Sequence, residues 1–175
     1  PDIPIVSEEL PDITIEQRQS WDRYWLVDPL DGTQEFVAGS GDFAVAIALI
    51  DNNLPTIGVI YAPIHNRCYL ASRGNGAYRR DEHGLKPIKI NTDQQAKVKI
   101  AVSLRQSKET VLSRVSTQFE YELIPMGSAT LKSCLIAEGG ADFYMRVGPT
   151  GEWDTGAAHC ILTEAGGDIK DLGLQ

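Results

Sequence analysis

The sequence predicts a layered α/β protein, with a sheet-rich first half and a second half in which strands and helices alternate. Continuous apolar runs at 43–50 and 56–62 flank a short turn, which is typical of a buried β-hairpin. Beyond residue 98, strand-like runs alternate with stretches whose apolar residues recur at helical spacing, and this order favours an α/β layer. Apolar residues make up 42% of the chain and charged residues 23%, as in ordinary globular proteins.

The N-terminal half is expected to begin with an edge strand. The segment 2–6 is short, apolar and interrupted by proline, and a polar, irregular stretch at 10–23 follows it as a mobile flap. The apolar run 24–27 predicts a buried strand. This strand should end at Asp28, because Pro29 cannot donate to a sheet ladder.

A single helical turn is expected at 34–37, before the hairpin. Further strands are expected at 68–71, 76–79 and 88–90, with a polar turn at 81–84. The first half is therefore predicted to be mostly antiparallel sheet.

A polar link at 91–97 is the best candidate for a boundary between two lobes, which we place at 1–95 and 96–175. The second lobe is expected to alternate strands at 99–103, 121–125 and 142–146 with helices at 107–117, 128–138 and 153–165.

Charge excludes one class of partner. The formal net charge is −8 over 175 residues, whereas binders of polymeric DNA or RNA need clustered Lys and Arg. The same charge would repel a phosphorylated small molecule unless bound cations reverse the local field. No apolar run approaches the roughly twenty residues of a membrane span, and no secretory signal is visible, so a cytoplasmic location is expected.

Three cysteines, Cys68, Cys134 and Cys160, show no metal-ligand spacing. Each lies among apolar neighbours, so we expect small core residues in a reducing compartment. The sequence begins with Pro1 and not with Met, which indicates that an upstream part of the protein is missing.

Two aspartates at the end of the strand at 24–27 are candidate metal ligands. Asp31 follows Asp28 by three residues, and Gly32 lets the backbone turn sharply towards whatever the carboxylates hold. Carboxylates that flank a peptide carbonyl form an oxygen-rich corner of the kind that Mg²⁺ prefers. Asp-Pro and Asp-Gly are also ordinary turn dipeptides, and on these residues alone a turn is the better interpretation.

Two more acidic corners, far away in sequence, favour the metal site. Glu8 follows the first expected strand, although a solvated pair of glutamates would also explain it. Asp154 opens the last helix, where it is a natural N-cap, and the small residues 156–158 would let that helix pack tightly. Together with Asp28 and Asp31, these side chains carry four negative charges, which two divalent cations would offset.

These motifs resemble those of the inositol monophosphatase superfamily of Mg²⁺-dependent, lithium-sensitive phosphomonoesterases. The similarity runs from Pro1 to about Asp171. It is carried by Glu8-Glu9, Asp28-Pro29-Leu30-Asp31-Gly32-Thr33, and Trp153-Asp154 with Glu164-Ala165-Gly166-Gly167. Three further stretches resemble the bacterial 3'(2'),5'-bisphosphate nucleotidases of the CysQ type, namely Gly127-Ser128 with Leu131-Lys132, Tyr144 to Thr150, and Glu152 to Thr155.

The resemblance implies a layered α-β-α-β-α sandwich of the inositol monophosphatase/fructose-1,6-bisphosphatase type. It also implies two or three Mg²⁺ ions, and catalytic roles for the acidic ligands and for Thr33, whose hydroxyl would help to orient the attacking water. The implied metal ligands are Glu8, Asp28, Asp31, Asp154 and the carbonyl of Leu30. The implied substrate contacts are Gly32, Thr33, Ser128, Lys132, Arg146 and Asp154.

Structural alternatives stay open for three of these substrate residues. Ser128 would serve equally as a helix N-cap, Lys132 as a solvated helix residue, and Arg146 as the partner of a surface carboxylate. Gln106 stands where such nucleotidases often have a histidine, which weakens the case for adenine-nucleotide specificity. Family members also carry an upstream segment with an Asp that helps to activate water, and a further strand beyond the last glycine pair.

The expected function is Mg²⁺-dependent removal of the 3'-phosphate from adenosine 3',5'-bisphosphate, giving AMP and phosphate, by a metal-activated water. Lys132 and Arg146 favour this substrate over inositol monophosphate, which needs no second anion site. An inositol monophosphatase, or an inactive or incomplete metal-binding homologue, is the alternative. The expected partner is a small phosphorylated nucleotide in the cytoplasm, with a role in sulfur metabolism. Homo-oligomerisation, peripheral association with the inner membrane, and preference for the sulfated form of the nucleotide stay open.

Overall fold

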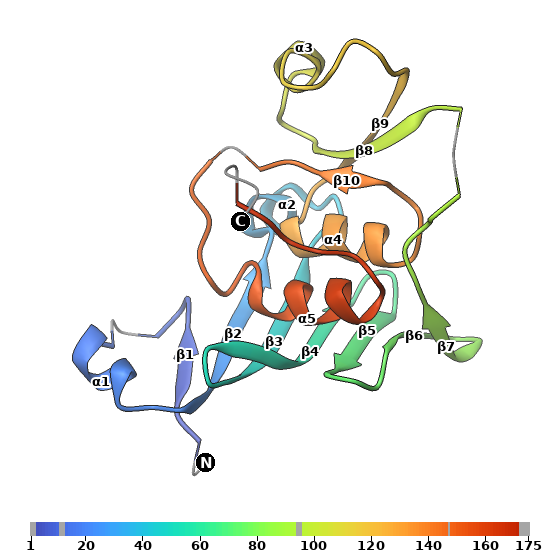
Figure 1. Cartoon of the computed structure of the whole chain (residues 1–175). Helices are drawn as coiled ribbons and strands as arrows, with labels where there is room; N and C mark the ends of the chain where they lie inside the picture. Colours follow the sequence, from blue (N-terminus) through green and yellow to red (C-terminus); the bar gives the residue numbers. More distant parts are fainter. Residues whose placement is uncertain (1–2, 11–12, 94–95, 147, 172–175) are drawn as a thin grey trace.

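Two β-sheets with a pair of helices between them make up the fold (Figure 1). Helices α4 (Ala129–Ala137) and α5 (Gly156–Glu164) form the middle layer. Both bury their apolar sides in one core shared with the larger sheet. The structure, a computed structural model, describes residues 3–10, 13–93, 96–146 and 148–171.

The larger sheet has seven strands in the order of the sequence. β1 (Ile5–Ser7) lies at one edge and is parallel to β2 (Arg23–Asp31), and from β2 onward each strand is antiparallel to the next. The other strands are β3 (Ala44–Asp51), β4 (Leu54–Ala62), β5 (Arg67–Ser72), β6 (Ala77–Asp81) and β7 (Gly84–Ile88). The predicted edge strand, hairpin and mostly antiparallel sheet are confirmed.

The smaller sheet has three parallel strands, with β8 (Val98–Ser103) between β9 (Tyr121–Met126) and β10 (Phe143–Tyr144). Helix α3 (Lys108–Leu112) packs against β8 in a small core of its own. Parallel strands joined through helices confirm the α/β character of the second half. The layered α/β class is therefore confirmed, with successive layers of sheet, helices, sheet and α3 (Figure 1).

Small residues let α5 lie directly on the larger sheet, as residues 156–158 predicted. At Gly58 on β4, an added Cβ would lie 2.5 Å from the carbonyl oxygen of Ala157. At Gly156, an added Cβ would lie 2.7 Å from the side chain of Leu26 on β2. This close packing brings the start of α5 against β2. Residues from both halves of the chain contribute to this core. The division into lobes at 95/96 stays a prediction.

β2 does not end at Asp28, as the sequence predicted, but continues to Asp31. Asp28 pairs with Ala46 and Asp31 with Ala44, so β2 advances three residues where β3 advances two. The extra residue is a β-bulge, where Pro29 is tolerated because no ladder hydrogen bond is required of it. Residues three apart in a regular strand face opposite sides of the sheet. The bulge corrects this parity, and both aspartates are buried.

Two other predictions for the first half are wrong. The stretch 10–23, predicted as irregular, contains α1 (Ile15–Gln19), which Thr14 and Gln17 start with a reciprocal capping box. Of the strand expected at 88–90, only Ile88 lies in a strand, as the last residue of β7, whose ladder with β6 ends there.

Four elements of the second half are shorter than predicted, including α4, which covers 129–137 and not 128–138. α3 covers only 108–112, β10 covers only 143–144, and α5 begins at 156 and not at 153. Cys134 and Cys160 are buried as predicted, but Cys68 is only partly buried. No helix in the described part of the chain is long and apolar enough to cross a membrane.

Candidate active site

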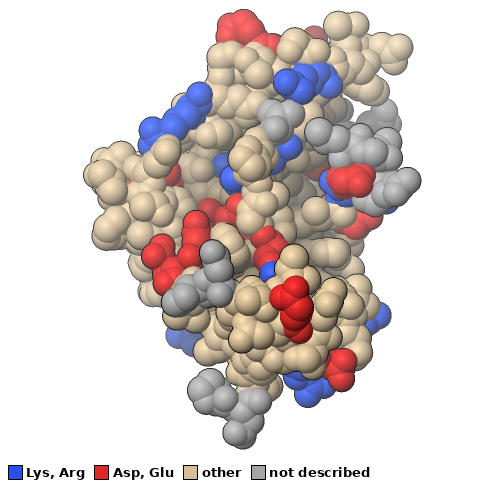
Figure 2. Space-filling view, turned by 90° about the vertical axis from the view of Figure 1, so that its left-hand side faces the viewer, with Lys and Arg blue, Asp and Glu red and all other residues tan. Residues whose placement is uncertain are grey.

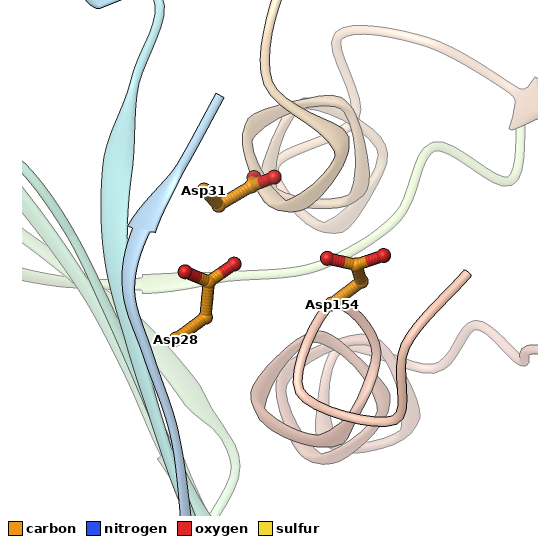
Figure 3. Close-up of side chains that lie close together, drawn as sticks. All are labelled: Asp28, Asp31 and Asp154. Carbon is orange, nitrogen blue, oxygen red and sulfur yellow. The ribbon is translucent and has the colours of Figure 1, made fainter. Parts of the chain in front are cut away.

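Three aspartates from two distant parts of the chain meet at one corner of the fold, which we call the metal corner (Figure 3). Asp28 and Asp31 come from the bulged end of β2, and Asp154 comes from the turn before α5. Their carboxylates point towards one another, and one oxygen from each lies within 4.8 Å of the others. Carboxylate oxygens at this spacing can share a divalent cation.

Asp28 is the most deeply buried of the three, with an exposed fraction of 1%. Its Oδ1 accepts the N–H of Leu30 at 2.9 Å, whereas its buried Oδ2 has no hydrogen-bond partner among the described residues. Burial raises the pKa of Asp28 to about 7, and the charges of Asp31, Glu8 and Asp154 also raise it. An unpaired buried carboxylate is costly, and a bound cation would supply the missing partner.

Asp31 is held by the first turn of α4. Its Oδ2 accepts the N–H of Thr130 at 2.8 Å, the hydroxyl of Thr130 at 2.6 Å and the hydroxyl of Ser128. Ser128 is also the N-cap of α4, because its Oγ accepts the N–H of Leu131 at 3.1 Å. Three donors on one oxygen fix the carboxylate, and Oδ1 is the oxygen that remains for a ligand.

Asp154 is not the N-cap of α5, contrary to the prediction. The N-cap position is Thr155, which makes no side-chain capping bond. Asp154 turns its Oδ2 back to the preceding loop, where it accepts the hydroxyl of Thr150 at 2.7 Å and the N–H of Gly151 at 3.0 Å. The same arrangement is found in the other two aspartates, where protein donors hold one carboxylate oxygen and the other oxygen remains for a ligand.

The metal corner lies in the wall of a cavity of about 710 Å³. Figure 2 shows acidic side chains gathered around a hollow in the middle of one face, with basic side chains nearby. Glu8 lines this cavity with the three aspartates, although it does not belong to the closely spaced group. The fourth predicted acidic ligand is therefore near the others, at the rim of the same site.

The loop after β2 turns back into the cavity at Gly32, which has a φ of 91°. A side chain there would be strained, and its Cβ would lie 2.9 Å from the carbonyl oxygen of Asp42. Helix α2 (Thr33–Ala38) begins at once, and the Thr33 hydroxyl donates to the carbonyl of Leu30 at 3.2 Å. Because the Thr33 hydroxyl donates its proton to the Leu30 carbonyl, the lone pairs of its oxygen can accept a hydrogen bond from a water in the cavity.

The predicted substrate residues differ in their exposure and in how many of their hydrogen-bond donors already have protein partners. Arg146 is half-exposed beside the cavity, but its Nε and Nη2 donate to the carbonyl of Pro149 at 3.2 and 2.9 Å. Its Nη2 also lies 3.5 Å from Oδ2 of Asp154. Lys132 is buried and not a solvated helix residue, and burial lowers its pKa to about 8. Ser128 is fully buried and donates to Asp31, and it is also the N-cap of α4, which was its alternative interpretation.

Sequence reasoning missed three residues of this site. Thr130 gives Asp31 two of its donors, and its only signal is its place two residues after the N-cap Ser128. Glu35 on α2 pairs with Arg105, which follows β8, at 2.8 Å, and both line the cavity. No local pattern connects residues so far apart, so only the fold reveals this pair.

A model of the inositol monophosphatase family matches residues 1–175, and the chain belongs to this family. Among its relatives, the 3'(2'),5'-bisphosphate nucleotidase CysQ of Aggregatibacter actinomycetemcomitans is 43% identical over 176 residues. The CysQ of Escherichia coli K12 is 43% identical over 172 residues. These findings confirm the resemblance that the acidic motifs indicated.

A solved structure shows the same fold. The crystal structure of CysQ from Bacteroides thetaiotaomicron, a bacterial member of the family, matches with a TM-score of 0.84 at 36% identity, over 94% of this chain and 66% of that one. The chain spans about two thirds of the length of the curated relatives it matches: all of it aligns with 65% of the Aggregatibacter protein, and 98% of it with 68% of the Escherichia protein.

Proposed function

We propose that the protein is a Mg²⁺-dependent phosphomonoesterase that removes the 3'-phosphate of adenosine 3',5'-bisphosphate. The observation that carries this proposal is the metal corner, where three carboxylates converge and each has one oxygen held by protein donors. The name of the CysQ relatives, 3'(2'),5'-bisphosphate nucleotidase, supports the substrate class. The three free cysteines fit a cytoplasmic, reducing compartment.

The residues present fit Mg²⁺. Every proposed donor is an oxygen, which is what this hard cation requires, and the buried Oδ2 of Asp28, which has no hydrogen-bond partner among the described residues, would be available to it. Two or three bound ions would lower the pKa of a water and stabilise the charge that develops on the phosphate. The proposed ligands are Glu8, Asp28, Asp31, Asp154 and the carbonyl of Leu30.

The chain's own groups would orient the reaction. The Thr33 hydroxyl, fixed by its hydrogen bond to Leu30, would accept a hydrogen bond from the attacking water. Gly32 lines the cavity and would meet the phosphate of the substrate there. Arg146, at the edge of the cavity beside Asp154, would bind the second phosphate with its planar fork. A monophosphate substrate lacks the second phosphate that Arg146 would bind.

Phosphate release from adenosine 3',5'-bisphosphate and from inositol 1-phosphate, assayed side by side with Mg²⁺ and with EDTA, tests the proposal. We expect release that depends on Mg²⁺ and is faster with the bisphosphate. Faster release from inositol 1-phosphate would make the protein an inositol monophosphatase. Absence of release from both substrates, in a protein that binds the metal, would identify an inactive homologue.

A further inference from the structure

Lys132 is an ammonium group enclosed by protein. Its exposed fraction is 1%. The Nζ donates to the backbone carbonyls of Met126, Gly127 and Ser128 at 3.2, 3.0 and 2.9 Å, and it lies 4.9 Å from the centre of the Tyr144 ring. An ammonium has three N–H donors, so these carbonyls account for all of them. A substrate phosphate could reach Lys132 only if this arrangement were broken.

The carbonyls that Lys132 binds belong to the β9–α4 turn, which we define as residues 126–130. Ser128 and Thr130 of this turn are the residues that donate to Oδ2 of Asp31. The side chain of Lys132 therefore reaches back over the first turn of its own helix and binds the backbone whose side chains orient Asp31. One residue links the body of α4 to the metal corner.

The β9–α4 turn is fixed from its other side as well. The N–H of Gly127 donates to Oδ2 of Asp42 at 2.8 Å, and an added Cβ at Gly127 would collide with the side chain of Glu35. With Lys132 in place, the turn has polar partners on both sides. Without the ammonium, the carbonyls of Met126 and Gly127 would lose this donor, and that of Ser128 would keep only the backbone N–H of Lys132 at 3.3 Å, so the turn would have to move to find others.

We propose that Lys132 is a positioning residue that fixes the β9–α4 turn and, through Ser128 and Thr130, aims Asp31 at the metal. This inference rests on the proposed metal site and gives Lys132 a role different from the substrate contact implied by the family resemblance. Groups that orient metal ligands typically change metal affinity by roughly ten- to a hundredfold when they are removed.

Metal binding without substrate tests the inference. Mn²⁺ affinity, measured by electron paramagnetic resonance, should fall roughly ten- to a hundredfold in Lys132→Met. Thr130→Val should also weaken binding, because it removes one donor to Asp31. The double variant should be no weaker than the worse single variant, since both changes act through the same carboxylate. In a turnover assay, kcat should fall while the KM for the nucleotide stays unchanged.

Two other variants complete the test. Lys86→Met, at an exposed position on β7, is the control for loss of one positive charge and should bind Mn²⁺ as the wild type does. Lys132→Gln keeps two N–H donors and should show a smaller loss, and it carries the test if thermal unfolding shows that Lys132→Met does not fold.

Wild-type Mn²⁺ affinity in the folded Lys132 variants would overturn the inference, as would additive losses in the double variant. A raised nucleotide KM with unchanged Mn²⁺ affinity would show that Lys132 binds the substrate. If the wild type itself bound no Mn²⁺, the proposed function would fail together with the inference. That result is distinct from equal binding by wild type and variants, which overturns the role of Lys132 alone.

Discussion

The acidic and the basic sides of the cavity are built in opposite ways. In the metal corner, each of Asp28, Asp31 and Asp154 has one oxygen held by protein donors, and one oxygen of each carboxylate lies within 4.8 Å of the others. On the basic side, Lys132 and Arg146 have already given N–H donors to backbone carbonyls. Under the proposed function, the carboxylates of this corner would need little rearrangement to bind a cation. An anion that binds Lys132 or Arg146 would instead have to replace existing hydrogen bonds.

This difference predicts that substitutions in the metal corner affect catalysis most. Asp31→Asn preserves the shape of the side chain but removes one charge, and we expect activity to fall by roughly two orders of magnitude or more while the protein stays folded. Phosphate release at saturating Mg²⁺, with circular dichroism as the check on folding, measures this. The control is Asp51→Asn, at a surface ion pair with Arg23 on the far end of β2. If Asp31→Asn turned over like the wild type, the metal corner would not be the catalytic site.

A smaller effect is expected on the basic side. Arg146→Ala should raise the KM for adenosine 3',5'-bisphosphate by roughly ten- to a hundredfold, the usual value of a charged hydrogen bond. Hydrolysis of inositol 1-phosphate should change little, and Arg146→Lys should recover only part of the loss because it lacks the fork. Steady-state kinetics with both substrates separates these outcomes. An equal effect on both would mean that Arg146 supports Asp154, which it approaches, and does not bind the second phosphate.

The smallest effect, when it is counted for each pH unit, concerns protons at the metal corner. The pKa of Asp28, about 7 in the folded protein, lies above its ordinary value of 3.8, so the folded state keeps a proton that the unfolded chain loses. The free energy of unfolding of the metal-free protein should therefore fall as the pH rises from about 4 to about 7. Mg²⁺ affinity should rise by up to about tenfold per pH unit below pH 7, as the competing proton leaves.

Urea unfolding in EDTA across this pH range, for the wild type and for Asp28→Asn, isolates the contribution of Asp28. The variant cannot ionise at this position, so the difference between the two proteins should follow the titration of Asp28. Parallel pH profiles would show that this carboxyl does not titrate near neutrality.

The meeting of the three aspartates could be predicted from sequence only by combining separate acidic motifs with the family resemblance, because Asp28 and Asp31 alone favour a turn. Asp28 and Asp31 lie at a strand end beside a proline and a glycine, and small residues after Asp154 predicted that the last helix packs tightly against another element. The bulge that turns both aspartates to one side was not predicted, since it depends on the register between β2 and β3. The N-cap prediction for Asp154 failed because nearby donors at Thr150 and Gly151 compete for its carboxylate.

The basic side could not be predicted in the same way. Lys132 has the spacing of a solvated helix residue, and only the path of the β9–α4 turn places three carbonyls around its ammonium. The Glu35–Arg105 pair depends on how α2 lies beside the loop after β8, which no local pattern encodes. The sequence therefore predicts the residues on this side of the cavity better than it predicts their partners.

The central claim is that the three aspartates of the metal corner bind a divalent cation. Anomalous diffraction from crystals of the protein soaked in Mn²⁺ tests it most directly. We predict an anomalous peak between the three carboxylates, with Oδ2 of Asp28, the buried oxygen without a partner among the described residues, as one of its ligands. Absence of a peak in that corner, at a Mn²⁺ concentration that supports full activity, would contradict the account.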